Sequence, residues 1–263
     1  MADSTELLAS PDDHALAHRL ATEAGALLMA ARDEMVGNGA SSADLKVEGD
    51  RRANRFLMDA LASERPDDPI LSEEERENPE ATATRLASRR AWIVDPLDGT
   101  REFSEPPRSD WAVHVALCID GEPLVGAVAL PALGITLSTL HPPELAPRDD
   151  HPPRVIMSRT RPPAEAHRIT DALAATIVEM GSAGAKAMAV VRNEADVYPH
   201  SGGQYEWDSC APVAVALAAG LWCTRLDGRP LRYNNEDPYL PDLLICRPEM
   251  APAAIAAADL AHD

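Results

Sequence analysis

The chain has 263 residues, and its 24 basic and 43 acidic side chains give a formal net charge of -19. This length allows one large domain or two lobes that share an interface. The acidity excludes general binding to nucleic acid or to an anionic membrane surface, because both would repel the chain. No apolar run approaches the roughly 20 residues that a membrane span needs, and the four cysteines lie too far apart for a zinc or disulfide framework. We expect a cytoplasmic protein with no secretory signal.

The first half of the chain combines helices with strands. Apolar residues at helical spacing predict amphipathic helices over residues 14–35, capped by Asp12 or Asp13, and over residues 51–64. Asp50 stands at the start of the second helix, where its carboxylate could cap the helix or face a ligand. Apolar runs broken by turn residues then predict an antiparallel meander of strands at residues 91–94, 112–118, 124–130 and 135–140.

The second half alternates strands and helices. Residues 141–153 hold five prolines and no periodic pattern, which predicts an exposed connection between two lobes. Beyond it we expect strands at residues 154–157, 177–180, 195–198 and 243–246, with helices at residues 163–175, 185–192, 209–219 and 251–261. Such alternation favours an α/β lobe at residues 154–263, following an α+β lobe at residues 1–153.

The segment from Trp92 to Phe103 is the most informative for chemistry. Its apolar strand runs into Asp95, and Asp98 follows after the bend at Pro96, so two carboxylates leave the strand end together. Carboxylate oxygens suit a hard cation such as Mg²⁺, which also takes phosphate and water as ligands. Gly99 has no Cβ and would let backbone N–H groups approach an anion, while the Thr100 hydroxyl could orient a water. The same residue types also form ordinary Asx turns, so the segment alone leaves both interpretations open.

Other candidate residues are distant in the sequence. Glu73 to Glu75 follow a possible short strand at residues 71–72, although such acids are usually solvated loop residues. Asp208 begins the helix predicted at residues 209–219, where it could simply be an N-cap. Lys186 and Lys46 are the only lysines among the 24 basic residues, so Lys186, beside a glycine-rich turn, could bind a phosphate or could merely begin a solvated helix.

Two motifs together narrow the choice of family. Asp95-Pro-Leu-Asp-Gly-Thr100 and the later Trp207-Asp-Ser-Cys-Ala211 resemble the two signatures of the lithium-sensitive, magnesium-dependent phosphomonoesterases, the family of inositol monophosphatase and fructose-1,6-bisphosphatase. The resemblance spans nearly the whole chain and implies a layered α/β/α/β/α fold with the site between the lobes. The run from Thr100 to Phe103, with Lys186 and Glu206, is similar to the 3'(2'),5'-bisphosphate nucleotidase branch. The implied substrate is 3'-phosphoadenosine 5'-phosphate, whose 3'-phosphate would be hydrolysed to give AMP.

The resemblance also implies residue roles. A first Mg²⁺ would bind Glu73, Asp95 and the Leu97 carbonyl, and a second would bind Asp95, Asp98 and Asp208. A weaker third ion would lie near Glu73 and Asp50. The implied catalytic residues are Asp50, Glu73, Asp98 and Thr100, with Asp50 and Thr100 acting on the attacking water and Asp208 steering a proton to the leaving oxygen. The implied substrate-binding residues are Glu73, Leu97, Asp98, Gly99, Thr100, Lys186 and Asp208.

Two departures from the family pattern leave alternatives open. The early segment reads Asp44-Leu-Lys-Val-Glu-Gly-Asp50, without the threonine that relatives often carry, so the role of Asp50 is the least fixed. Ser72 stands where glycine is common, so either Glu73 or Glu74 could be the ligand, and we favour Glu73.

Three other functions are alternatives to this one. The same metal chemistry could act on inositol 1-phosphate or fructose 1,6-bisphosphate, because the metal ligands do not recognise the leaving group. A glycoside hydrolase with paired carboxylates would not explain the Gly99–Thr100 turn, and a noncatalytic binding protein would not explain so many intact acids. Relatives of this kind are often homodimers, and a small phosphate ester is the expected partner.

Overall fold

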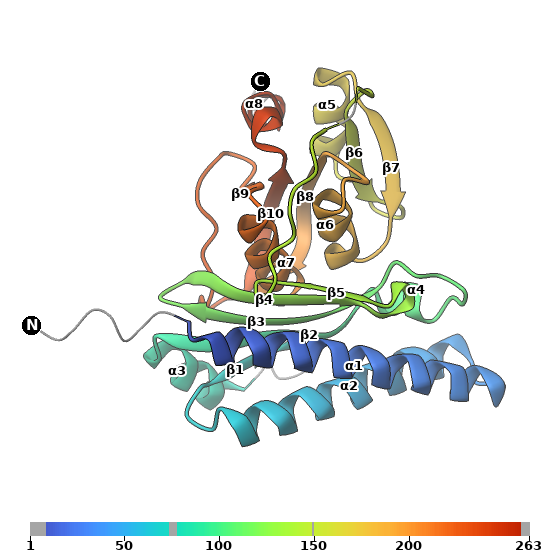
Figure 1. Cartoon of the computed structure of the whole chain (residues 1–263), viewed down its shortest axis with the longest axis vertical. Coiled ribbons are helices and arrows are strands. Elements are labelled where there is room, and N and C mark those ends of the chain that lie inside the picture. Colours follow the sequence, from blue (N-terminus) through green and yellow to red (C-terminus); the bar gives the residue numbers. More distant parts are fainter. Residues whose placement is uncertain (1–8, 74–77, 149, 259–263) are drawn as a thin grey trace, which may run out of the picture.

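The computed structural model, which describes residues 9–73, 78–148 and 150–258, is a stack of helices and sheets in five layers (Figure 1). Helices α1 (Pro11–Gly37) and α2 (Ser42–Glu64) cover one face of the first sheet. The strands of that sheet, in spatial order, are β1 (Ile70–Ser72), β2 (Arg90–Asp98), β3 (Ala112–Ile119), β4 (Glu122–Leu130) and β5 (Ile135–Ser138). The pairs from β2 to β5 are antiparallel and β1 pairs parallel with β2, so the predicted meander is confirmed.

The other three layers come from the second half of the chain. Helices α6 (Ala183–Val191) and α7 (Glu206–Ala218) form the middle layer, and α5 (Ala164–Ala172) and α8 (Ala251–Ala258) cover the far face of the second sheet. The strands of the second sheet, in spatial order, are β7 (Thr176–Met180), β6 (Arg154–Ser158), β8 (Val197–Tyr205), β10 (Tyr239–Cys246) and β9 (Trp222–Thr224). The predicted α/β/α/β/α order of layers is therefore confirmed. The lobe boundary at residue 153 stays a prediction, although every strand of the first sheet precedes it and every strand of the second follows it.

Three apolar clusters fill the interfaces between the layers. One cluster joins α1 and α2 to the first sheet, a second lies between the two sheets around α6 and α7, and a third lies under α5 and α8. A helix buried on several sides needs apolar residues all round, and α7 is buried along almost its whole length from Glu206 to Ala216. Small residues make this close stacking possible: a Cβ on Gly126 of β4 would lie 2.6 Å from the Ala211 carbonyl oxygen of α7.

The structure corrects several predicted element boundaries. Helix α1 begins at Pro11, and its cap is Ser10, whose hydroxyl accepts from the Asp13 N–H at 3.2 Å while Asp13 accepts from the Ser10 N–H at 3.0 Å. Asp12 and Asp13 are therefore not the cap. Helix α2 begins at Ser42, which places Asp50 within the helix, so the capping role for Asp50 is wrong.

Short elements escaped prediction. Among the described residues these are α3 (Pro79–Ala87), β9 and two single 3₁₀ turns at Pro131–Leu133 and Pro248–Met250. The short helix α4 (Thr100–Phe103) begins directly after Gly99. In the part of the chain that the structure describes, no helix combines the length and the apolar character needed to cross a membrane.

Candidate active site

The end of strand β2 carries two of the candidate acids. Pro96 cannot donate a ladder hydrogen bond, and the register of β2 against β3 shifts between Asp95 and Asp98. Asp95 Oδ1 accepts a hydrogen bond from the Leu97 N–H at 3.0 Å, so this carboxylate does form the Asx turn that its sequence allows. Asp95 and Asp98 are both buried, 2% and 6% exposed, which shows that the turn is not an ordinary surface turn.

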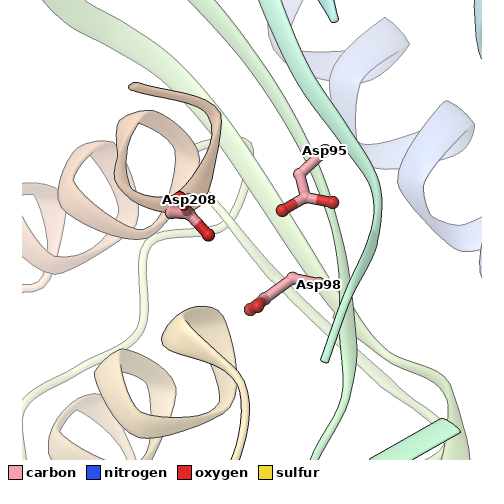
Figure 2. Close-up of side chains that lie close together, drawn as sticks. All are labelled: Asp95, Asp98 and Asp208. Carbon is pink, nitrogen blue, oxygen red and sulfur yellow. The ribbon is translucent and has the colours of Figure 1, made fainter. Parts of the chain in front are cut away.

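The third acid comes from the other half of the chain. Asp208, in the first turn of α7, accepts from the Tyr205 N–H at 2.7 Å and thereby helps to cap its helix. Figure 2 shows its carboxyl group facing Asp95 and Asp98. One oxygen from each of these three residues lies within 4.8 Å of the others. Asp208 therefore helps to cap α7 and also belongs to the acidic cluster.

The charge distribution in this cluster favours a cation. Burial, followed by the charges of Asp98 and Asp208, raises the pKa of Asp95 well above its usual value. Burial, followed by the charge of Asp98, raises the pKa of Asp208 to about 7. The charges of Glu73 and Asp50 add to the rise at Asp95. Two buried carboxylates and a partly exposed third that repel one another are a donor set for a hard divalent cation, whose charge would remove that repulsion.

Asp98 differs from its neighbours because hydrogen-bond donors surround it. Its Oδ2 accepts from the Ser182 hydroxyl at 2.5 Å and from the Gly184 N–H at 2.6 Å, and its Oδ1 accepts from the Ala183 N–H at 3.0 Å. Burial alone would raise the pKa of Asp98, but His114, Ser182 and Lys186 together lower it to about 2. The start of α6 therefore holds Asp98 ionised and ties β2 to the middle helical layer.

The turn after Asp98 depends on glycine. Gly99 has φ +82°, a left-handed conformation, and a Cβ there would lie 2.9 Å from Cβ of Ser182 and 3.2 Å from Cα of Trp111. Helix α4 starts at the next residue, where the Thr100 hydroxyl donates to the Leu97 carbonyl at 3.2 Å. Because the proton of the Thr100 hydroxyl is used in this bond, the lone pairs of its oxygen can accept a hydrogen bond from a water.

A cleft of about 620 Å³ opens beside the acidic cluster. Asp98 and Asp208 stand at its wall together with basic residues Arg101, Arg161 and Lys186. Lys186 is only 5% exposed; its ammonium donates to the Ser182 carbonyl and lies 5.3 Å from the ring centre of Tyr198. The alternative of a solvated helix start is therefore wrong for Lys186.

The structure brings together most of the predicted site residues. Five of them line the cleft: Asp98, Gly99, Thr100, Lys186 and Asp208. Asp95 completes the acidic cluster, and Leu97 lies between its aspartates on β2. Asp50 and Glu73 act on this cluster through their charges, and Glu74 falls outside the described residues.

Other residues around the site were not among the predicted site residues. Ser182 donates to Asp98, and Asp110 accepts from the Gly181 N–H at 2.7 Å, which fixes the turn before α6 from outside the cleft. His114 is completely buried, and its Nε2 lies 3.2 Å from Asp98 Oδ2. Only the distance between segments far apart in the chain reveals these roles.

A comparison with protein-family models now identifies the family. The model described as the inositol monophosphatase family matches residues 12–142 and 152–260. The chain belongs to the inositol monophosphatase family. The family predicted from the motifs is thereby confirmed.

Individual members of the inositol monophosphatase family are similar over most of the chain. The 3'-phosphoadenosine 5'-phosphate phosphatase of Mycobacterium tuberculosis is 52% identical over 220 residues, covering 80% of each chain. The protein of the same name from Mycobacterium leprae is 48% identical over 262 residues, covering 95% of this chain and 94% of its own. The crystal structure of CysQ from Bacteroides thetaiotaomicron, a member of the same family, aligns with a TM-score of 0.72 at 26% identity, over 90% of this chain and 97% of that one.

Proposed function

We propose that the chain is a Mg²⁺-dependent phosphomonoesterase that releases the 3'-phosphate of 3'-phosphoadenosine 5'-phosphate. The observation that supports it most directly is the placement of Asp95, Asp98 and Asp208 in one cluster at the wall of a cleft that also carries Lys186. Relatives about half identical to the chain bear the name of this activity.

The acidic cluster would hold the cations. Asp95, Asp98 and Asp208 would be shared among two or three Mg²⁺ ions with Glu73 and the Leu97 carbonyl as further ligands. Bound Mg²⁺ supplies a lowered pKa for the attacking water and neutralises charge on the phosphoryl oxygens.

The remaining residues would bind and orient the reactants. The Thr100 oxygen, whose proton is donated to Leu97, would accept from the attacking water, and Asp50 would take a proton from that water. The backbone N–H groups of Gly99 and Thr100 would bind the scissile phosphate. Asp208 would pass a proton towards the leaving 3'-oxygen.

The basic part of the cleft supports a substrate with a second phosphate. Lys186 is buried and lies in the same cleft as the aspartates, and Arg101 and Arg161 also line that cleft. Inositol 1-phosphate has only one phosphate and would leave these charges without an anion. Fructose 1,6-bisphosphate also has two, so it is the stronger of the two alternatives. Cytoplasmic location and a homodimer stay predictions from the sequence.

The decisive experiment compares the three phosphate esters. Phosphate release from 3'-phosphoadenosine 5'-phosphate, inositol 1-phosphate and fructose 1,6-bisphosphate is measured with Mg²⁺ and again with a chelator. We expect the nucleotide to have the highest kcat/KM, and we expect the chelator to abolish release. A preference for a sugar phosphate would contradict the proposed substrate, and activity that survives chelation would contradict the metal mechanism.

A further inference from the structure

His114 lies beneath the acidic cluster, although it lines no part of the cleft. It stands in the middle of β3, directly opposite Asp95 of β2, and it is 0% exposed. Its neighbours Val113 and Val115 point to the other face of the sheet, into the apolar cluster beneath α1 and α2. The His114 ring therefore faces the middle helical layer, where α6 and α7 begin.

The ring contacts both segments that supply aspartates to the cluster. Nδ1 lies 3.0 Å from the Trp207 carbonyl oxygen, and because a carbonyl can only accept, Nδ1 carries the proton of this hydrogen bond. Trp207 immediately precedes Asp208, so this bond holds the peptide from which Asp208 projects. Nε2 lies 3.2 Å from Asp98 Oδ2, at ion-pair distance but outside hydrogen-bond geometry.

Helix α6 also packs against the His114 ring. A Cβ on Gly184 would lie 2.0 Å from His114 Nε2, so only glycine lets the helix approach this closely. The Gly184 N–H donates to the same Asp98 Oδ2 that faces His114. The ring and the start of α6 are therefore packed around one carboxylate oxygen, and the other nitrogen of the ring contacts the start of α7.

An apolar side chain would be the ordinary choice at such a position. Burying an imidazole removes its two nitrogens from water, which is unfavourable unless both have polar neighbours. Here both nitrogens have polar neighbours. Nδ1 faces the carbonyl of Trp207, which precedes the candidate ligand Asp208, and Nε2 faces the side chain of the candidate ligand Asp98. This arrangement matches the way in which residues behind a metal site fix the orientation of the ligands.

We propose that His114 is a positioning residue that holds Asp98 and the start of α7 at a fixed separation, so that Asp98 and Asp208 are preorganised for one cation. The inference rests on the cation site of the proposed function. His114 touches neither the cleft nor the cation, and it acts only through Asp98 and Trp207.

Three substitutions separate its two contacts. His114→Leu removes both polar contacts, His114→Asn keeps a donor near the position of Nδ1, and His114→Gln keeps a polar group near the position of Nε2. For each folded variant, Mg²⁺ affinity is measured by titration calorimetry in the absence of substrate, and kcat and KM are measured separately. We expect Mg²⁺ to bind His114→Leu about 10-fold or more weakly, with a lower kcat and little change in the KM for substrate. His114→Asn and His114→Gln should fall between His114→Leu and the unmodified protein.

A matched control distinguishes positioning from packing. Val115→Ala truncates the next residue of the same strand, on the face away from the site. It should lower thermal stability and leave Mg²⁺ affinity unchanged. Mg²⁺ affinity and kcat that stay unchanged in His114→Leu, or in both amide variants if His114→Leu does not fold, would overturn the inference. If the unmodified protein itself bound no Mg²⁺, the proposed function would fail, and the inference with it.

Discussion

At the scale of single residues, the site places charges where they oppose folding. Asp95 is buried beside Asp98 and Asp208, and the charges of these neighbours add to the rise in its pKa. Without a cation, the repulsion between the ionised carboxylates destabilises the folded chain. Function and stability of the metal-free protein therefore make opposite demands on this residue.

Asp95→Asn tests that opposition. The amide keeps the shape of the side chain and removes its charge, so the melting temperature of the metal-free variant should rise by a few degrees, on the order of 1 kcal/mol. Mg²⁺-dependent phosphate release should fall by at least about 100-fold, since a ligand is lost. Calorimetry with a chelator and a phosphate-release assay measure the two effects. Normal turnover in Asp95→Asn would refute the assigned role.

Lys186 gives a second prediction at this scale. Lys186→Met keeps the length of the side chain but removes the charge that the proposal assigns to the non-scissile phosphate. A hydrogen bond to a charged group contributes about 1.5 to 3 kcal/mol, so kcat/KM for 3'-phosphoadenosine 5'-phosphate should fall at least about 10-fold. The value for adenosine 3'-phosphate, which has no 5'-phosphate, should change little.

Lys46 provides the matched control for that variant. It is the other lysine of the chain, it belongs to α2, and it does not line the cleft. Lys46→Met should leave both substrates unaffected. An equal loss on both substrates in Lys186→Met would show that Lys186 supports the scissile centre or the fold and not the second phosphate.

At the scale of elements, one buried carboxylate joins α1, α2 and β2. Asp13 accepts from the N–H of the α1 cap residue Ser10, and it also accepts from Arg65 Nε at 3.0 Å and from Arg90 Nη2 at 3.2 Å. Burial alone would raise the pKa of Asp13, but the bonds from Ser10, Arg90 and Arg65 lower it from 3.8 to about 2. An acid whose pKa is lowered on folding stabilises the fold at higher pH, and this stabilisation disappears as the pH falls through the folded-state value.

Asp13→Asn should therefore be destabilising only above acidic pH. At pH 7 we expect a loss of about 1 to 2 kcal/mol in the free energy of unfolding. Below pH 4 the difference from the unmodified protein should shrink, and near pH 2 it should be almost gone. Urea unfolding at several pH values measures it. A difference that stays constant with pH would mean that the amide disturbs packing instead.

A second prediction for elements concerns the contact between β4 and α7. A Cβ on Gly126 would lie 2.6 Å from the Ala211 carbonyl oxygen and 2.7 Å from Cβ of Ala214. Gly126→Ala should cost about 1 to 3 kcal/mol because the core becomes overpacked, and it should lower kcat because α7 carries Asp208. Chemical denaturation and kinetics measure both effects. Gly37→Ala, where a Cβ meets nothing within 4 Å, is the control and should be neutral or slightly stabilising.

The helices and strands were predicted correctly where burial determines the pattern of apolar residues. Strand β3 is buried along its whole length, so its apolar run marks it clearly. The first turns of α2 escaped because Leu45 and Gly49 are the only buried residues there, and Gly49 is required by a contact that the sequence does not show. A Cβ on Gly49 would lie 2.7 Å from the Phe103 ring, which comes from α4.

The site residues also differ in how far the sequence reveals them. Asp95 and Asp98 could be found because they lie three residues apart in one motif. Asp208 needed a second motif, because only the fold shows that α7 begins beside β2. Ser182, in the glycine-rich turn before Lys186, and His114 were not predicted to act on Asp98, because their relation to Asp98 depends on distances across the layers.

At the scale of the whole molecule, the layers explain why the site needs both halves of the chain. Asp95 and Asp98 belong to the first sheet, whereas Asp208, Lys186 and the donors of α6 belong to the layer between the sheets (Figure 1). A cation shared by Asp95, Asp98 and Asp208 would join these layers. Its binding should therefore stabilise the molecule as a whole, and not only the turn at Gly99.

Because the net charge is -19, a test of this stabilisation needs a salt control. Any salt screens the repulsion among surface acids, so Mg²⁺ must be compared with NaCl at equal ionic strength. A ligand at 100 times its Kd stabilises the folded state by about 2.7 kcal/mol, which should raise the melting temperature by roughly 5 °C beyond the NaCl control. The extra rise should vanish in Asp95→Asn, which changes the total charge by only one unit. If Mg²⁺ and NaCl raised the melting temperature equally in both proteins, the stabilisation would come from screening alone and the buried aspartates would not bind the cation.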